Sequence, residues 1–202
     1  LIKDASNCVA HSFDKNFIRL SLHRPYTKEH LYFNKSFNWS RYLMPSYYPI
    51  NKAFNKTIVL SGIGISKDFS ALITDITPDI QLQPNGQCFP LYYYEENTSK
   101  QKGMFDEDNK YDYIRRDAIS DFILERAKKI YGKNVTKEDI FYYVYGILHS
   151  MEYREIFAND LKKMLPRLPS VEEVIDYRAF SKAERKLAEL HLNYETVAPF
   201  AD

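Results

Sequence analysis

The stretch from Thr136 to Glu195 constrains the fold most, because helix signals follow one another there in close succession. In its first part the apolar residues recur at helical spacing, at Ile140, Val144, Ile147 and Leu148. Thr136 and Asp139 stand three residues apart, which is the spacing of a capping pair at a helix start. The pattern therefore predicts an amphipathic helix from 137 to 149.

Further helices are expected on both sides of this one. A second helix follows from Met151 and must end before Pro166, since proline has no backbone N–H to donate. Two more pairs have the spacing of a capping box and predict helix starts, Ser170 with Glu173 and Ser181 with Glu184. Upstream, an apolar face between 111 and 131 ends at Gly132, a residue typical of a helix end. The second half of the chain is predicted to be a helical bundle.

The first half has a different pattern. Short segments rich in Ile, Val, Leu, Phe, Tyr and Thr alternate with Pro, Gly, Asn and Asp. These predicted strands are 16–22, 30–33, 57–60, 70–74 and 88–94. No helical pattern of useful length separates them, which favours an antiparallel, twisted or partly closed sheet over a parallel one. The predicted fold class is therefore α+β.

Domain boundaries follow from the same change of pattern. We expect a β-rich subdomain over residues 1–94, a flexible linker or loop over 95–110, and a helical subdomain over 111–202. A chain of 202 residues is long enough for one core or for a composite core shared by two subdomains. The sequence leaves open which of the two it forms.

Composition excludes several classes of protein. With 45% hydrophobic and 27% charged residues the chain is expected to fold as an ordinary globular protein. No apolar run is long enough to cross a bilayer, so no membrane partner is expected. Cys8 and Cys88 lack the spacing of a metal site or a disulfide framework, which predicts a cytoplasmic location.

Charge is distributed unevenly along the chain although the net charge is only +1. Residues 1–67 contain ten Lys and Arg against three Asp and Glu, whereas residues 111–202 contain fifteen against sixteen. A polyanion is therefore expected to meet the first part of the chain, with the helical part as support.

Several phrases resemble one bacterial family. EDIFYYVYGILHS, YREIFANDLKKMLPRLP and KLAELHLNYETV resemble the C-terminal end of type ISP restriction-modification enzymes. The resemblance extends upstream through HRPYTKEHLYFN, RYLMPSYYP, SGIGISKDFSALITDITPDI and GQCFPLYYYE, and so covers the chain from about Arg24 to Pro199. Those enzymes join a nuclease, a helicase-like motor, an adenine methyltransferase and a terminal target recognition domain in one chain.

The resemblance implies that this chain is the target recognition domain and binds double-stranded DNA. S-adenosylmethionine, ATP and Mg²⁺ would then be used by other domains of the parent chain, whose methyltransferase and helicase domains would be its partners. None of the matched phrases is a catalytic motif, and no cofactor is expected in this fragment itself. Specificity is expected in the first half and positioning in the second.

Candidate DNA contacts are cations, amides and hydroxyls in the first half, since these groups contact phosphates and base edges. They are Arg24, Lys28, Arg41, Tyr42, Ser46, Lys52, Lys56, Ser66, Lys67, Gln83, Asn85 and Gln87. Arg41 is the candidate for a guanine. The amides flank a turn at 84–86, and a polar hairpin tip without a DNA role explains them somewhat better. An ordinary surface loop explains RYLMPSYY equally well, and SGIGISK also fits a tight turn in which Gly62 and Gly64 have positive φ.

Two other functions remain as alternatives. Asp79, Asp108 and Lys110 follow the order of a metal-dependent nuclease site, although the last two fall in the polar linker, where a chance match is easy. A protein-interaction scaffold is the second alternative, with the helical half docking a partner. The five histidines have no ligand spacing, so a zinc site is not expected.

Overall fold

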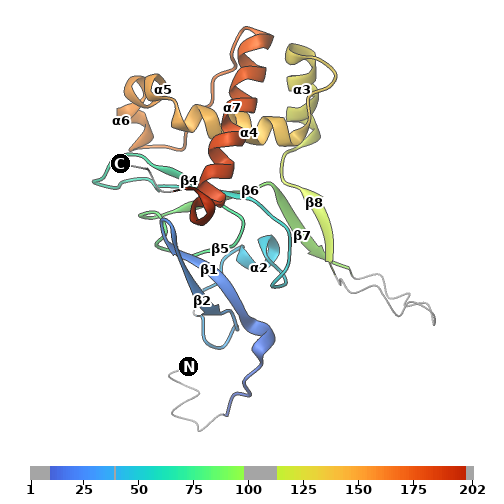
Figure 1. The fold of residues 1–202 in the computed structure, drawn as a ribbon, viewed down its shortest axis with the longest axis vertical. Coiled ribbons are helices and arrows are strands. Elements are labelled where there is room, and N and C mark those ends of the chain that lie inside the picture. The colour runs from blue at the N-terminus through green and yellow to red at the C-terminus, as the bar shows by residue number, and fades with distance from the viewer. Residues whose placement is uncertain (1–9, 39, 98–112, 199–202) are drawn as a thin grey trace, which may run out of the picture.

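The computed structural model describes residues 10–38, 40–97 and 113–198, and its architecture is α+β, as predicted. Small sheets and the short helix α2 form the first half, and helices α3 to α7 gather at the opposite end of the molecule (Figure 1). The strands are β1 (Ile18–Arg24), β2 (Thr27–Tyr32), β3 (Thr57–Leu60), β4 (Ala71–Thr74), β5 (Thr77–Pro78), β6 (Gln87–Pro90), β7 (Tyr92–Glu96) and β8 (Tyr113–Asp117). The α-helices are α2 (Met44–Tyr47), α3 (Asp121–Tyr131), α4 (Lys137–His149), α5 (Met151–Ile156), α6 (Ala158–Leu161) and α7 (Val174–Leu192), with 3-10 turns η1 (Lys15–Phe17) and η2 (Tyr194–Thr196).

The described strands form three small sheets, none of them closed. Their orders are β2-β1-β5, β4-β3-β6 and β7-β8. All neighbours are antiparallel except β1 and β5, where Ser21 pairs with Thr77 in parallel. The short β5 was not predicted, because two residues containing a proline carry no strand pattern.

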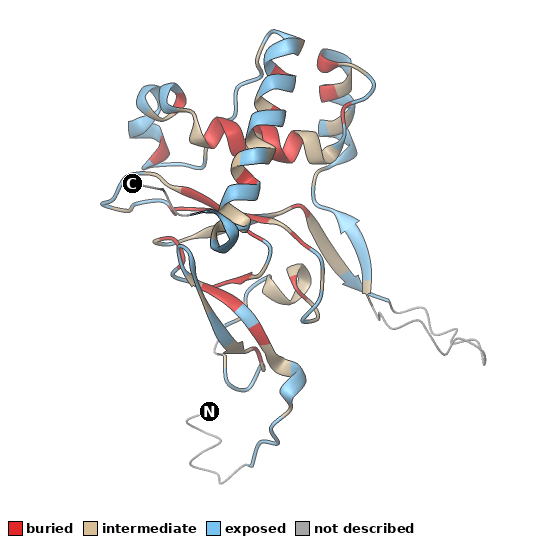
Figure 2. Cartoon of the chain, in the orientation of Figure 1, coloured by how far each residue is buried: buried red, intermediate tan, exposed pale blue. Residues whose placement is uncertain are grey.

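The central strands β3 and β4 are buried along their whole length (Figure 2). Ile58 and Ile73 face the helices and belong to one core cluster, while Val59 and Leu72 belong to a second cluster with Leu22 of β1. Since successive side chains of a strand point to opposite faces, this sheet is covered on both. The unbroken apolar runs of these strands follow from that double burial.

One core joins the two halves of the chain. The cluster that contains Ile58 and Ile73 also contains Tyr145 and Leu148 of α4 and Ala188 of α7, each at most 2% exposed. The sequence left open whether the two halves share one core, and these residues show that they do. The division at 94 and 111 stays a prediction, and residues 98–110 of the expected linker lie outside the described residues.

The helix α4 confirms the prediction made from its periodicity. It spans Lys137–His149, and Thr136 and Asp139 form a reciprocal capping box. The Asp139 amide donates to the Thr136 hydroxyl at 3.1 Å, and the Thr136 amide donates to the Asp139 carboxylate at 2.9 Å. Two otherwise unpaired backbone donors at the helix start are thereby satisfied.

Two other helix predictions were wrong in their boundaries. Residues 113–117 form strand β8 against β7, and α3 begins only at Asp121, behind the Ser120 cap. Cross-strand contacts support the strand, because Arg115 lies 4.4 Å over the ring of Tyr92. The helix expected from Met151 is divided into α5 and α6 at Phe157, which serves as the C-cap of one and the N-cap of the other.

The two predicted capping boxes before the last helix were also wrong. Helix α7 begins at Val174, and its N-cap residue Glu173 makes no side-chain cap bond. Ser181 lies within the helix, is 5% exposed, and donates from its hydroxyl to the backbone oxygen of Asp139 at 3.3 Å. Tertiary burial therefore explains a serine that looked like a helix start.

We expect stability to decrease on acidification because of two histidines beside the shared core. Burial lowers the pKa of both His149 and His191, and the His149 ring donates to the Tyr145 carbonyl over 2.8 Å. Below pH about 6.5 the unfolded chain binds protons that the folded chain resists, so the free energy of unfolding falls as pH falls. Urea unfolding at pH 7.5 and 5.5 measures the decrease. His149→Gln should reduce it, whereas His30→Gln on exposed β2 should not.

Candidate nucleic-acid interface

The first group of candidate residues lies at the end of the β4-β3-β6 sheet where β3 finishes. The loop 61–70 joins β3 to β4 there, and the turn 84–86 precedes β6. The Gly62 amide donates to the Pro84 carbonyl at 2.8 Å and so ties the loop to the turn. A Cβ atom on Gly62 would lie 1.9 Å from the Asn85 backbone oxygen. The SGIGISK loop and the amide-rich turn, separate in the sequence, are thus brought together.

Glycine has two different roles in this loop. Gly64 has the positive φ expected of a turn residue, at 76°, and an added Cβ there would meet nothing within 4 Å. The predicted positive φ of Gly62 was wrong, since Gly62 is required for space instead. Asn85 adopts the left-handed conformation of the opposing turn, with φ of 50°.

Members of this first group differ in their availability to a partner. Ser66, Lys67 and Asn85 are exposed. Gln87 is half-buried on β6, whereas Gln83 is 8% exposed and its amide oxygen accepts a hydrogen bond from the Ser70 hydroxyl. In this structure the Gln83 side chain links the end of the loop, at Ser70, to the start of the turn.

Arg24 lies next to the same region. Its guanidinium donates to the Gln81 carbonyl at 3.4 Å and lies 3.9 Å from the Asp79 carboxylate. Lys28, on the neighbouring strand, contacts η2 instead and donates to Glu195 at 2.7 Å. The structure therefore places Arg24 with the first group and engages Lys28 in a contact to the C-terminal segment.

The second group surrounds α2, before β3. Tyr42 is 72% exposed with φ of 44°, and the Ser46 hydroxyl donates to the Leu43 carbonyl at 2.7 Å. Lys52 is exposed, and the Lys56 ammonium donates to the Tyr142 hydroxyl of α4 at 2.5 Å. These residues precede β3, whereas the loop and the turn of the first group follow it.

Arg41 in this second group has a neighbour that the sequence did not single out. The guanidinium groups of Arg41 and Arg19 lie 5.2 and 4.2 Å from the centre of the Phe33 ring. Arg19 is only 6% exposed. In the sequence it alternates with Ile18 and Leu20, a pattern that places it on the solvent face of a strand, yet β1 exposes Leu20 and buries Arg19.

The residues of the metal-dependent nuclease alternative are not brought into a metal site within the described ranges. No group of three or more His, Cys, Asp or Glu there has the geometry to hold a metal ion. Asp79 lies 3.8 Å from His23 and near Arg24, and the other two residues of the nuclease alternative, Asp108 and Lys110, fall outside the described residues. No described helix is long and apolar enough to span a membrane.

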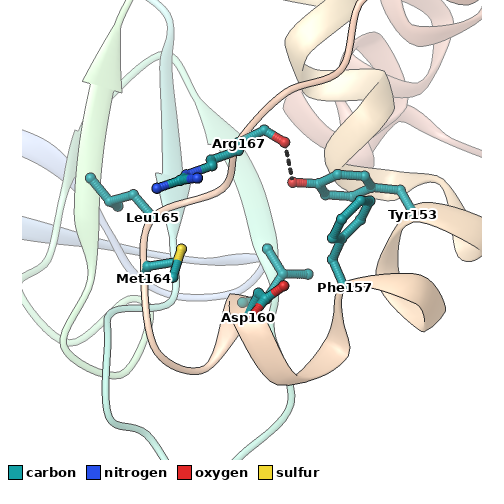
Figure 3. A pocket seen from close by; sticks show the side chains of 7 residues that line it. Tyr153, Phe157, Asp160, Met164, Leu165 and Arg167 are labelled. Carbon is teal, nitrogen blue, oxygen red and sulfur yellow. Dashed lines mark hydrogen bonds between the residues drawn. The ribbon is translucent and has the colours of Figure 1, made fainter.

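An apolar cavity is lined by residues on either side of Lys162, whose carbonyl accepts a hydrogen bond from the Gly64 amide of the loop at 3.0 Å. It has a volume of about 310 Å³ between α5, α6 and the chain that follows them. Figure 3 shows its lining, with the Tyr153 hydroxyl donating to the Arg167 carbonyl at 3.0 Å beside Phe157. Since its walls are mostly apolar, it does not suit a phosphate, and it forms no part of the candidate interface.

The fold and the two surface groups define an α+β binding module with basic and amide side chains on its sheet-containing half. The family model that describes the type ISP C-terminal specificity domain matches residues 1–202. The chain therefore belongs to that family.

Solved structures agree with this assignment. The chain matches the DrdV-DNA complex with a TM-score of 0.86 and 34% identity over 99% of its length. It also matches the ATP-dependent type ISP restriction-modification enzyme LlaBIII bound to DNA, with a TM-score of 0.81 and 31% identity over 100% of its length. A third match is a nuclease-deletion mutant of the type ISP enzyme LlaGI in complex with a DNA substrate mimic, with a TM-score of 0.76 and 31% identity over 98% of this chain's length. The chain spans 18%, 12% and 16% of those chains. A comparison with curated proteins found no match.

Proposed function

We propose that this chain recognises a specific double-stranded DNA sequence as the target recognition domain of a type ISP restriction-modification enzyme. The observation that supports this most is the match, over nearly its whole length, to parts of three enzymes solved with DNA or a DNA mimic. The basic first half and the two surface groups carry the kinds of side chain that would make the phosphate and base contacts of such a role.

The proposal assigns no catalysis to this domain. ATP-dependent cleavage and adenine methylation, with S-adenosylmethionine, ATP and Mg²⁺, would belong to other domains of a parent chain, in the way that LlaBIII is an ATP-dependent enzyme. The methyltransferase and helicase domains of that chain would be the protein partners. This domain would choose the asymmetric site at which the adenine is methylated.

Selection from a pool of randomised duplexes tests the function. The purified chain is expected to retain duplex DNA without Mg²⁺ and to enrich one asymmetric sequence over successive rounds. Retention without enrichment would leave general DNA binding but no recognition, and absence of retention at low salt would favour the scaffold alternative. Cutting that depends on Mg²⁺ would favour the nuclease alternative.

Neutralising Lys52 and Lys67 together should weaken binding to every duplex alike. Both side chains are exposed, and neither has a carboxylate within 4 Å among the described residues. Because each phosphate contact releases counterions and contributes about 0.9 to the slope of log K against log salt, the double Gln variant should lose nearly 2 from that slope. Fluorescence anisotropy over a salt series measures it. The matched variant Lys129→Gln with Lys186→Gln, on the helical half, should keep the wild-type slope.

A further inference from the structure

Arg19 is a buried cation that is not among the candidate DNA contacts. Its side chain enters from β1, is 6% exposed, and donates from Nη1 to the Tyr48 carbonyl at 2.6 Å. Its Nε is buried without a hydrogen-bond partner. Buried guanidinium groups are normally satisfied by a carboxylate, because an isolated charge loses the hydration that water gave it.

The charged group beside Arg19 in this part of the structure is a second cation, Arg41, and not a carboxylate. Arg41 shares the Phe33 ring with Arg19, and Phe33 is itself 5% exposed. No carboxylate of the described ranges lies within 4 Å of either guanidinium. Burial, and then the charge of Arg41, lower the pKa of Arg19 to about 10. Two like charges therefore lie against one aromatic ring, and neither is neutralised by a carboxylate of the described ranges.

An anion is what this arrangement lacks. A guanidinium presents its N–H donors in a planar fork that matches a phosphate, and partial burial strengthens the interaction. The buried Arg19 is held by its hydrogen bond to the Tyr48 carbonyl and by the Phe33 ring. Arg41 is only half-buried, and the residue that follows it, Tyr42, is exposed.

We propose that Arg19 and Arg41 form a site for one backbone phosphate of the DNA. This inference rests on the proposed function and changes the role of Arg41. The sequence suggested a guanine contact, but a guanidinium anchored over a buried ring beside a second cation is suited to a phosphate, whose position it fixes without distinguishing bases.

Binding by three single variants tests the site. Arg41→Gln and Arg19→Met each remove one charge, and Arg41→Lys keeps the charge while removing the fork. The first two should weaken binding to selected and unrelated duplexes by the same factor, about tenfold at low salt, and reduce the salt slope by about 1. Arg41→Lys should keep the slope and lose only part of the affinity.

Thermal unfolding separates a phosphate site from a purely structural role. Without anion, Arg19→Met should unfold at a temperature no lower than the wild type, because an uncompensated buried charge has been removed. Inorganic phosphate, compared with chloride at equal ionic strength, should raise the unfolding temperature of the wild type more than that of Arg19→Met. Lys129→Gln, at an exposed position of the helical half, is the control and should respond to phosphate as the wild type does.

The outcomes distinguish this inference from the proposed function. If the wild type binds duplexes and Arg41→Gln and Arg19→Met keep its salt slope, the phosphate site is rejected while DNA recognition stands. A loss confined to the selected sequence would make Arg41 a base contact and also reject the site. If the wild type binds no duplex, yet phosphate protects it and not Arg19→Met, the proposed function fails and the phosphate site is retained with another source of phosphate.

Discussion

Truncation of Leu148 to alanine is expected to destabilise both halves of the chain together, by about 2–5 kcal/mol. Leu148 is 1% exposed and lies in the cluster that contains Ile58 and Ile73 of the central sheet. Removing the side chain leaves a cavity that neither the helix nor the sheet can close without losing other contacts. Urea unfolding followed by circular dichroism measures the loss, and hydrogen exchange of peptides from β3 and α4 locates it.

Leu190→Ala is the matched control, since this leucine of α7 is 52% exposed. Its unfolding free energy should stay within about 0.5 kcal/mol of the wild type. If Leu148→Ala lowered the protection of α4 amides and left β3 amides unchanged, the two halves would unfold separately. The predicted subdomain boundary near residue 94 would then be an energetic boundary as well.

Local signals predicted the elements in which each residue depends mainly on its sequence neighbours. Helix α4 has an apolar face and a capping box, and its observed bounds are the predicted ones. Strand β3 likewise matches the predicted 57–60, because a short run of Thr, Ile, Val and Leu between turn residues has little alternative.

The failures occurred where a distant segment decided the structure. Residues 113–117 form a strand because β7 offers an edge to pair with, although their own pattern also fits a helix. Ser181 is placed by its contact with the Asp139 carbonyl, 42 residues away, so its spacing to Glu184 was coincidental. Such pairings depend on the three-dimensional neighbours of a residue and leave no periodic signal.

The candidate interface shows the same division. Residue type and local charge identified the loop, the turn and the Arg41 segment as separate candidates. That the Gly62 amide ties the loop to the turn, and that Arg19 joins Arg41 over Phe33, follows only from tertiary packing. The sequence pattern even argued against Arg19, since alternation with two apolar residues placed it towards solvent.

Gly62→Ala is expected to disrupt the loop and the turn together and to abolish selective binding by the first group. The new Cβ would lie 1.9 Å from the Asn85 backbone oxygen and 2.7 Å from its carbonyl carbon. Backbone atoms cannot turn aside as a side chain does, so the turn must move and the Gly62 hydrogen bond to Pro84 must break. The cost should reach or exceed about 3 kcal/mol, at the upper end of overpacking. Urea unfolding and enrichment from the randomised duplex pool measure the two effects.

Gly64→Ala separates crowding from backbone strain in the same loop. An alanine there meets no atom within 4 Å, but it must adopt a φ of 76°, which costs an L residue roughly 1–2 kcal/mol. The Gly64 amide is bonded to the Lys162 carbonyl at 3.0 Å and not to the turn, and no atom must move aside for the added Cβ. The turn around Asn85 should therefore stay in place and the selected sequence should be unchanged. Equal loss of selectivity in the two variants would mean that loop conformation alone matters, whereas retained selectivity in Gly62→Ala would remove the loop and turn from the DNA-recognising surface. A larger effect of Gly62→Ala than of Gly64→Ala on both stability and selectivity would indicate that the loop 61–70 and the turn 84–86 act as one functional unit.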